Sequence, residues 1–307
     1  MGRAGTGIGY TDPPPYRRGV DRPGVRPCRR WHPKAAAANG LAVEELSLEQ
    51  VRDRFPQHAH LPDHYVGLWD AEAGIVRPEA AITESLRLAA KDGADVRTGT
   101  RVQLIDDDGD AVLLRTGAGS VRARHVVVAS GPWMRTLLPN VPVQAVRNPM
   151  LWFDSPHPQR FTADAFPAFI RHYDDTHTLW GHGSAEGRPV KVGLSPDARF
   201  MPDIDIDTID RGVDAERDWG HLSRVLRTAI PELNPIPASA RPCVITNSPD
   251  GQFLVGRLPA RPRITIAGGC SGHGFKHASA IGEIVARDIV GEQQSTDVSF
   301  LSPARFG

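Results

Sequence analysis

The sequence predicts a mixed fold, α/β and α+β in character, in which α/β segments are combined with an antiparallel sheet. Three observations lead to this prediction. A helix with a regular apolar face precedes short strands that end in a continuous apolar run at residues 126–129. A strand at residues 263–267 runs through a glycine-rich turn into another helix. Between these blocks, residues 141–240 contain longer strands and proline-rich turns, typical of a separate sheet.

Composition describes a globular chain without an excess of either charge. Of its 307 residues, 40% are apolar, and 36 Lys and Arg residues balance 36 Asp and Glu residues, so nucleic acid is not an expected partner. No apolar stretch approaches the roughly 20 residues that a bilayer requires. The first 30 residues also lack the apolar block of a secretory signal. We therefore expect no membrane association and a cytoplasmic location.

The three cysteines form no pair of obvious function. Cys28, Cys243 and Cys270 are far apart in sequence and include no CxxC motif. They are too few for a disulfide framework or a structural zinc site. Any special role must belong to an individual cysteine, and no metal site is expected.

Residues 1–40 are expected to be a disordered, nonnative tail. Residues 1–34 contain seven Arg, six Pro and six Gly, with almost no aliphatic periodicity, so they cannot offset the entropy cost of ordering. Eight basic and two acidic residues (8 − 2) give this segment a charge of +6. An anion-binding arm is the alternative interpretation.

Folded structure is expected to begin at Leu41. Ser47 and Gln50, three residues later, have the spacing of a helical capping box. Residues 78–90 predict a helix with proline at its first position and one apolar face. That face contains Ile82, Leu86 and Ala89. Strands are predicted at residues 95–98, 101–105, 111–115 and 120–130.

The second half predicts a sheet, a helix and a final block of strands. The expected strands are residues 150–153, 168–170, 178–180, 243–246, 253–255 and 263–267. A helix is predicted at residues 215–229, ended by Pro231. A second helix is expected to run to Val290.

The glycine-rich turn after residues 264–267 is the strongest local signal of chemistry. A strand, a glycine turn and a helix N-terminus together form a site for an anion. Glycines also let the backbone approach a flat ring closely. The run matches neither the GxGxxG nor the Walker A pattern, so a purely structural turn remains the alternative.

Three motifs, in order along the chain, resemble the monomeric sarcosine oxidase and N-methyltryptophan oxidase family of the D-amino acid oxidase-like class. Residues 268–276, Gly-Gly-Cys-Ser-Gly-His-Gly-Phe-Lys, are similar to its C-terminal flavin-binding run. Residues 241–246, Arg-Pro-Cys-Val-Ile-Thr, and residues 249–256 resemble the strands that precede this run. Residues 124–133 resemble a strand leading to a Gly-x-Trp turn beside the cofactor. The resemblance covers residues 41–306.

The resemblance implies a partial FAD-binding, Rossmann-like domain with an inserted antiparallel-sheet substrate domain. Residues 41–140 and 241–307 would form the FAD-binding domain, and residues 141–240 the substrate domain. The implied reaction is FAD-dependent oxidation of the C–N bond of a secondary amine or N-methyl amino acid, with oxygen as acceptor, giving imine and hydrogen peroxide. Alternatives are an inactive truncated fragment and a flavin-free amino-acid-binding module.

The resemblance also implies residue roles. Cys243 would carry the flavin covalently through a thioether; the alternative is an ordinary buried strand cysteine. Lys191 would assist oxygen reduction; the alternative is a lysine on the exposed face of a strand. Lys276 would pair with the substrate carboxylate; the alternative is a solvated helix lysine. Trp180 would cover the substrate pocket; the alternative is simple core packing. The other implied cofactor-binding residues are Gly131, Trp133, Gly269, Ser271, Gly272, His273, Gly274 and Phe275.

Two departures from the family pattern matter for function. Ser195 stands where sarcosine oxidases have an active-site histidine, four residues after Lys191. A hydroxyl cannot replace an imidazole that titrates near neutrality, which places sarcosine itself in doubt as substrate. The family's N-terminal strand and GxGxxG turn are also not found here. We therefore expect this segment to be missing or to come from a separate chain, and the remaining parallel sheet to expose apolar edges.

Overall fold

A computed structural model describes residues 10–11, 36–174, 177–196 and 202–306, and these divide into two compact units. Unit 1 draws on residues 1–75, 148–201 and 211–243, and unit 2 on residues 76–147, 202–210 and 244–307. Residues 41–75, expected beside residues 76–140, therefore group with unit 1. Of the tail predicted to be disordered, residues 1–9 and 12–35 lie outside the described residues, as does Cys28.

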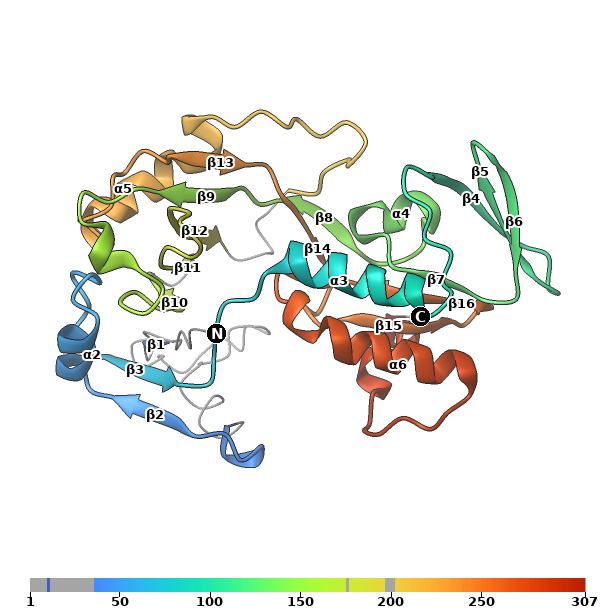
Figure 1. The fold of residues 1–307 in the computed structure, drawn as a ribbon, viewed down its shortest axis with the longest axis horizontal. Helices are drawn as coiled ribbons and strands as arrows, with labels where there is room; N and C mark the ends of the chain where they lie inside the picture. Colours follow the sequence, from blue (N-terminus) through green and yellow to red (C-terminus); the bar gives the residue numbers. More distant parts are fainter. Residues whose placement is uncertain (1–9, 12–35, 175–176, 197–201, 307) are drawn as a thin grey trace, which may run out of the picture. The chain divides into compact units, whose positions relative to one another are not determined.

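Unit 1 contains two antiparallel sheets (Figure 1). The smaller sheet has the order β1-β3-β2 and the larger the order β10-β11-β12-β9-β13. Their strands are β1 (Tyr10–Thr11), β2 (Val43–Leu46), β3 (Tyr65–Asp70), β9 (Met150–Phe153), β10 (Phe169–His172), β11 (His177–His182), β12 (Val190–Pro196) and β13 (Ser239–Arg241). The helical segments are α2 (Leu48–Arg54), η3 (Pro158–Phe161), a π-helical turn η5 (Ala215–Trp219) and α5 (Gly220–Ala229).

Local signals that set the helices of unit 1 are visible in the structure. Ser47 accepts from the Gln50 backbone N–H, and the Gln50 side chain accepts from Ser47 N, which confirms the capping box at α2. The helix predicted at residues 215–229 is present, but its first turn is π-helical. The buried face of α5 packs on the larger sheet, and together they form the main core of this unit.

A buried arginine joins three segments of unit 1. Arg171 on β10 is 2% exposed, and its guanidinium donates to the carbonyl oxygens of Ala229, Ala59 and His60 at 3.2, 3.0 and 3.3 Å. Ala229 ends α5, where the helix dipole places partial negative charge. The charge of Arg171 is therefore balanced by backbone carbonyls, and the bonds tie the loop after α2 to the sheet and to the end of α5.

Unit 2 contains three small sheets, with orders β14-β8, β15-β16-β7 and β4-β5-β6. Its strands are β4 (Val102–Asp107), β5 (Val112–Thr116), β6 (Gly119–Ala123), β7 (Val126–Val128), β8 (Gln144–Arg147), β14 (Val244–Asn247), β15 (Leu254–Leu258) and β16 (Arg261–Gly268). Its helices are α3 (Pro78–Lys91), α4 (Met134–Leu137), α6 (Ala278–Val290) and the short turns η2 (Gly131–Trp133), η6 (Phe275–His277), η7 (Ser299–Leu301) and η8 (Pro303–Phe306).

The core of unit 2 forms around β7 and β16. These strands pair in parallel, with Val126 opposite Ile264 and Val128 opposite Ile266, and all four side chains are buried. Helix α6 contacts β15 and β16 (Figure 1). The mixed fold predicted from the sequence is confirmed.

One predicted strand is wrong, and one predicted helix face is not buried. Residues 95–98 form no strand; they are exposed and lead into a turn at Gly99, whose φ is +64°. Helix α3 forms as predicted, but none of its residues is buried, and Ile82 is 52% exposed. No helix in the described residues is long and apolar enough to span a membrane.

We predict that His58 makes unit 1 sensitive to mild acid. Burial, with a smaller effect from the charge of Arg171, lowers the pKa of His58 to about 3. The ring packs against Phe166 and Phe169, at centroid distances of 4.9 and 4.6 Å. Between pH 6.5 and 3 the unfolded chain binds a proton that the folded chain does not, so stability is full above pH 6.5 and declines as pH falls.

Urea unfolding at pH 8 and pH 5 tests this prediction. His58 should account for a loss of about 2 kcal/mol at pH 5, and His58→Phe should lose that much less than the unsubstituted chain between the two pH values. His157→Gln, at an exposed histidine, is the matched control and should keep the full pH dependence. Equal pH dependence in the unsubstituted chain and His58→Phe would contradict the prediction.

Candidate functional site

In unit 2 the carboxyl ends of two strands meet at one edge of a sheet. Because β7 and β16 are parallel, Ser130 and Gly131 follow β7 at the same edge where Gly269 follows β16. Ligands of open α/β sheets bind outside the carboxyl ends of the strands. Pairing of strands far apart in sequence therefore brings the two glycine-containing turns predicted as a binding site to one place.

The turn after β16 presents backbone with few side chains. Gly269, Ser271 and Gly272 have φ values of +63°, +48° and +80°, in the left-handed region that glycine adopts without strain. A Cβ added to Gly274 would lie 2.6 Å from Sγ of Cys270. The glycine at this position is therefore required by close packing inside the turn, and the turn leads through η6 into α6.

Strand β14 holds this turn by hydrogen bonds on both sides of Asn247. Ser271 N donates to the Thr246 carbonyl at 2.7 Å, and Ser248 N donates to Ser271 Oγ at 3.2 Å. Asn247 itself pairs with Cys270 in an isolated bridge. Its side chain is 6% exposed, and neither Oδ1 nor Nδ2 has a hydrogen-bond partner among the described residues. The buried hydroxyl of Ser130 also lacks a partner there.

The remaining predicted residues of this turn differ in exposure. His273 is partly buried; its Nδ1 lies 3.1 Å from the Ser271 carbonyl and its ring centroid 4.9 Å from that of Phe253. Phe275 and Lys276 are exposed in η6. Trp133 is 39% exposed, and its Nε1 donates to Asp207 at 3.2 Å.

Both cysteines in the described residues are half-buried and outside disulfides. Cys243 immediately precedes β14, and its carbonyl accepts from Asn148 N at 2.8 Å. Burial raises the pKa of the Cys270 thiol, which keeps that thiol protonated and weakly nucleophilic. Cys270 therefore suits a packing role in the turn.

Unit 1 holds a second cluster of predicted residues, on one face of its larger sheet. Lys191 on β12 is half-buried, and its Nζ lies 5.6 Å from the ring centroid of Trp180 and 5.8 Å from that of Trp152. His182 is opposite Lys191 across β11 and β12. Burial is the main cause that lowers the pKa of His182, and the charge of Lys191 acts in the same direction. The ammonium is thus placed against two indoles, in cation–π geometry.

The position of Trp180 is set by two neighbours on β12. Gly193 is directly opposite Trp180, and a Cβ there would lie 2.2 Å from Cζ2 of the indole. Trp180 Nε1 donates to Ser195 Oγ at 2.8 Å. The indole therefore lies flat over the glycine and is held at its edge by the serine hydroxyl.

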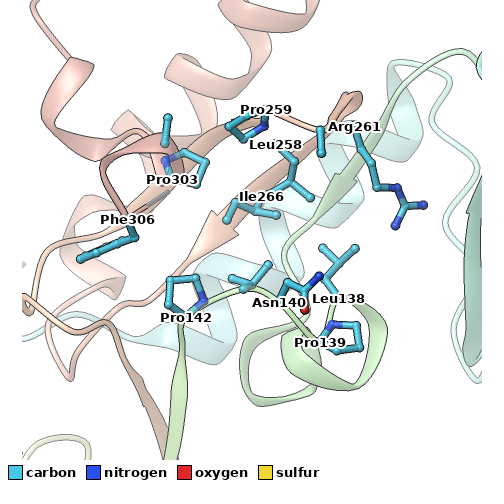
Figure 2. A pocket seen from close by; sticks show the side chains of 13 residues that line it. Leu138, Pro139, Asn140, Pro142, Leu258, Pro259, Arg261, Ile266, Pro303 and Phe306 are labelled. Atoms are coloured by element: carbon cyan, nitrogen blue, oxygen red, sulfur yellow. The ribbon is translucent and has the colours of Figure 1, made fainter.

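An apolar pocket of unit 2 is lined by none of the residues of the two clusters (Figure 2). It has a volume of about 340 Å³ and is lined mainly by proline and aliphatic side chains, with Arg261 as its charged residue. Arg261 donates to the Ile105 carbonyl at 2.9 Å. The pocket lacks converging polar groups, so we do not assign it as the functional site.

Sequence reasoning located most of these residues but missed four. Trp152, Gly193, Ser130 and Asn247 were not predicted as site residues, because each owes its place to a strand register or to burial. For Trp152 and Gly193, the available sequence signal was the glycine itself, which stands two residues after Lys191. Among the described residues, no group of three His, Cys, Asp or Glu side chains could hold a metal ion.

The family model described as FAD dependent oxidoreductase matches residues 16–287, most of the chain. The chain belongs to this family. It is also 31% identical over 266 residues to N-methyl-L-tryptophan oxidase of Salmonella dublin, covering 87% of this chain and 70% of that protein; the Salmonella typhi enzyme of the same name gives the same values.

Several solved structures have a similar fold. NikD, an unusual amino acid oxidase essential for nikkomycin biosynthesis, has a TM-score of 0.77 at 22% identity, covering 98% of this chain and 77% of that chain. Glycine oxidase from Geobacillus kaustophilus has a TM-score of 0.72 at 19% identity, covering 89% and 69%. L-proline dehydrogenase from P. horikoshii has a TM-score of 0.78 at 18% identity, covering 99% and 77%. The chain therefore has the fold of this FAD-dependent oxidoreductase family.

The residues at the strand-end edge of unit 2 fit a flavin. The glycine turn has left-handed backbone at Gly269, Ser271 and Gly272, and its glycines carry no Cβ that would keep a flat ring at a distance. Unpartnered buried polar atoms of Ser130 and Asn247 lie in the segments that border it. In this FAD-dependent oxidoreductase, the turns after β7 and β16 are thus the candidate cofactor site.

We predict that Gly193→Ala displaces Trp180. The added methyl group would overlap the indole, so the ring must move and release Ser195, at a cost of about 1–3 kcal/mol of unfolding free energy. The fluorescence contribution of Trp180, obtained by difference from a Trp180→Phe variant, should shift to longer wavelength.

Two matched variants accompany this measurement. Ser195→Ala removes the hydrogen bond alone and should produce a smaller shift. Gly117→Ala adds a methyl group where nothing lies within 4 Å and should leave the Trp180 signal unchanged. An unchanged spectrum in Gly193→Ala would show that the indole does not lie over this glycine.

Proposed function

We propose that the chain oxidises the C–N bond of a secondary amine or N-methyl amino acid, using oxygen as acceptor and giving imine and hydrogen peroxide. The observation that carries this proposal is the glycine turn beside the carboxyl ends of β7 and β16. The names of the relatives, N-methyl-L-tryptophan oxidases at 31% identity, support the substrate class. When bound, FAD would supply the redox chemistry.

The residues of unit 2 would hold the cofactor and the substrate carboxylate. The N-terminal end of α6, with the turn ahead of it, would stabilise negative charge that develops nearby. Gly131, Trp133, His273 and Phe275 would border the ring. The exposed ammonium of Lys276 would pair with the carboxylate of an amino-acid substrate.

The residues of unit 1 would act on oxygen and on the substrate side chain. Lys191, held against two indoles, would stabilise the negative charge of reduced oxygen. Trp180 would form an aromatic wall of the substrate pocket. Because the Ser195 hydroxyl accepts from Trp180, it fixes this wall, and the flat indole favours a substrate with a larger, planar substituent than sarcosine has.

We also propose that Cys243 carries the flavin. The thiol is half-buried and lies directly before β14, the strand that is hydrogen-bonded to the glycine turn. The thioether would join Sγ to a methyl carbon of the benzenoid ring. Forming this bond would release the thiol proton, one methyl proton and two electrons, for which oxygen would be the acceptor.

The covalent link predicts that flavin stays with denatured protein. Acid-precipitated unsubstituted protein should retain absorbance between 350 and 500 nm, whereas Cys243→Ala should release it to the supernatant. Cys270→Ala, at the other half-buried thiol, is the control and should keep the colour in the pellet. Colour released by all three proteins would overturn the link, and colourless protein would leave an inactive fragment or a flavin-free binding module.

The proposed location is the cytoplasm. Cys243 and Cys270 are both outside disulfides. A reducing compartment keeps such thiols available for chemistry.

We further propose that an additional polypeptide segment, on a separate chain, completes unit 2. In the described residues β7 pairs with β16 alone, and Val127 on β7 is 39% exposed. The apolar face of α3 is open, with Ile82 and Leu86 52% and 45% exposed. The open edge of β7 and the apolar face of α3 are each of the kind that an added strand and helix would cover.

The expected partner is a strand followed by a glycine turn and a helix. A strand-turn-helix segment of this kind from a Salmonella N-methyl-L-tryptophan oxidase, added as a separate polypeptide, should bind this chain and raise its FAD affinity. Ile82→Glu combined with Leu86→Glu should abolish that binding, measured by analytical ultracentrifugation, while Leu41→Glu, at an exposed leucine of unit 1, should not. Equal binding by both variants would contradict the proposal.

A further inference from the structure

Asn247 is buried beside the glycine turn without a hydrogen-bond partner for either atom of its amide. The residue is only 6% exposed. Both Oδ1 and Nδ2 are inaccessible to solvent, and neither has a hydrogen-bond partner among the described residues. An unpaired amide in a protein interior is unfavourable, and buried polar groups are normally satisfied. A bound ligand that supplies the missing hydrogen bonds would explain why this amide is buried.

The backbone fixes Asn247 at the candidate cofactor site. Its two neighbours, Thr246 and Ser248, both hydrogen-bond to Ser271 in the turn, and Asn247 is bridged to Cys270. Strand β14 also contacts η2, the turn that follows β7. Asn247 thus lies where the segments after β7, β14 and β16 meet.

A second orphaned group borders the same edge. The hydroxyl of Ser130 is buried and unpartnered among the described residues, directly before η2. Because these two unpaired polar side chains lie in segments that contact each other, we interpret them as hydrogen-bonding groups for one polar ligand.

The chemistry of the amide selects one part of a flavin. A carboxamide offers an acceptor and a donor side by side. The isoalloxazine ring presents the complementary pair only at its pyrimidine edge, where N3–H lies between two carbonyl groups; the benzenoid edge carries methyl groups. We propose that Asn247 binds this edge, with Oδ1 accepting from flavin N3–H and Nδ2 donating to an adjacent carbonyl oxygen. The inference rests on the flavin site proposed above.

The unsubstituted chain and Asn247→Leu are compared in a Cys243→Ala background, so that neither carries covalent flavin. The substitution Asn247→Leu gives opposite effects on stability and on binding. Leucine has a similar volume and no unpaired polar atoms, so the flavin-free variant should unfold at a higher urea concentration than the unsubstituted chain. Its affinity for riboflavin, measured by quenching of riboflavin fluorescence, should be about tenfold to a hundredfold weaker because two hydrogen bonds are lost. A structural role for the amide would instead lower stability.

Riboflavin methylated at N3 separates direct contact from an indirect effect. The unsubstituted chain should bind the methylated compound more weakly than riboflavin, whereas Asn247→Leu should bind the two equally. Asn140→Leu, at an exposed asparagine that lines the separate apolar pocket, is the matched control and should behave as the unsubstituted chain.

The outcomes distinguish this inference from the proposed function. If the unsubstituted chain binds riboflavin but Asn247→Leu binds it as tightly, or if both proteins discriminate equally against N3-methylation, the role of Asn247 is overturned and the flavin site stands. If the unsubstituted chain binds neither compound, the flavin site itself is overturned, and the inference with it.

Discussion

The parallel pairing of β7 with β16 is the constraint on which unit 2 depends. It joins strands that lie more than 100 residues apart and buries Val126, Val128, Ile264 and Ile266 together. It also places the two following turns at one edge of the sheet. Because parallel strands align their carboxyl ends, a site formed by backbone N–H groups and glycines arises there as a consequence of topology. The third strand to reach this edge, β14, holds the glycine turn through Ser271.

Unit 1 depends on a different constraint, the separation of two sheet faces. One face carries Leu151, Phe169, Leu179 and Val192 into the core beneath α5, together with the buried charge of Arg171, which the carbonyls of three segments satisfy. The opposite face carries Trp152, Trp180 and Lys191. Since successive residues of a strand alternate between faces, the same strands that bury the core also present the aromatic and cationic cluster.

Local sequence signals predicted the elements whose determinants are local. The capping box at Ser47, the proline-initiated helix α3 and the strand at residues 150–153 all have the predicted positions. The strand predicted at residues 95–98 does not form, because the β4-β5-β6 sheet begins at Val102 and offers residues 95–98 no ladder. The periodicity of α3 correctly predicted a helix, but periodicity states only that a face is apolar; the described residues do not bury it.

The sequence alone determined the family and the glycine turn, and it singled out Lys191, Trp180, Cys243 and Lys276 as candidates, because these are carried by residue type and by spacing along the chain. Only the tertiary structure decided which of these residues have neighbours that fix them. Gly193 beneath the indole, Ser195 at its edge and the unpaired amide of Asn247 follow from strand register and from burial. Both are set by contacts between segments distant in sequence, which no local pattern of residues encodes.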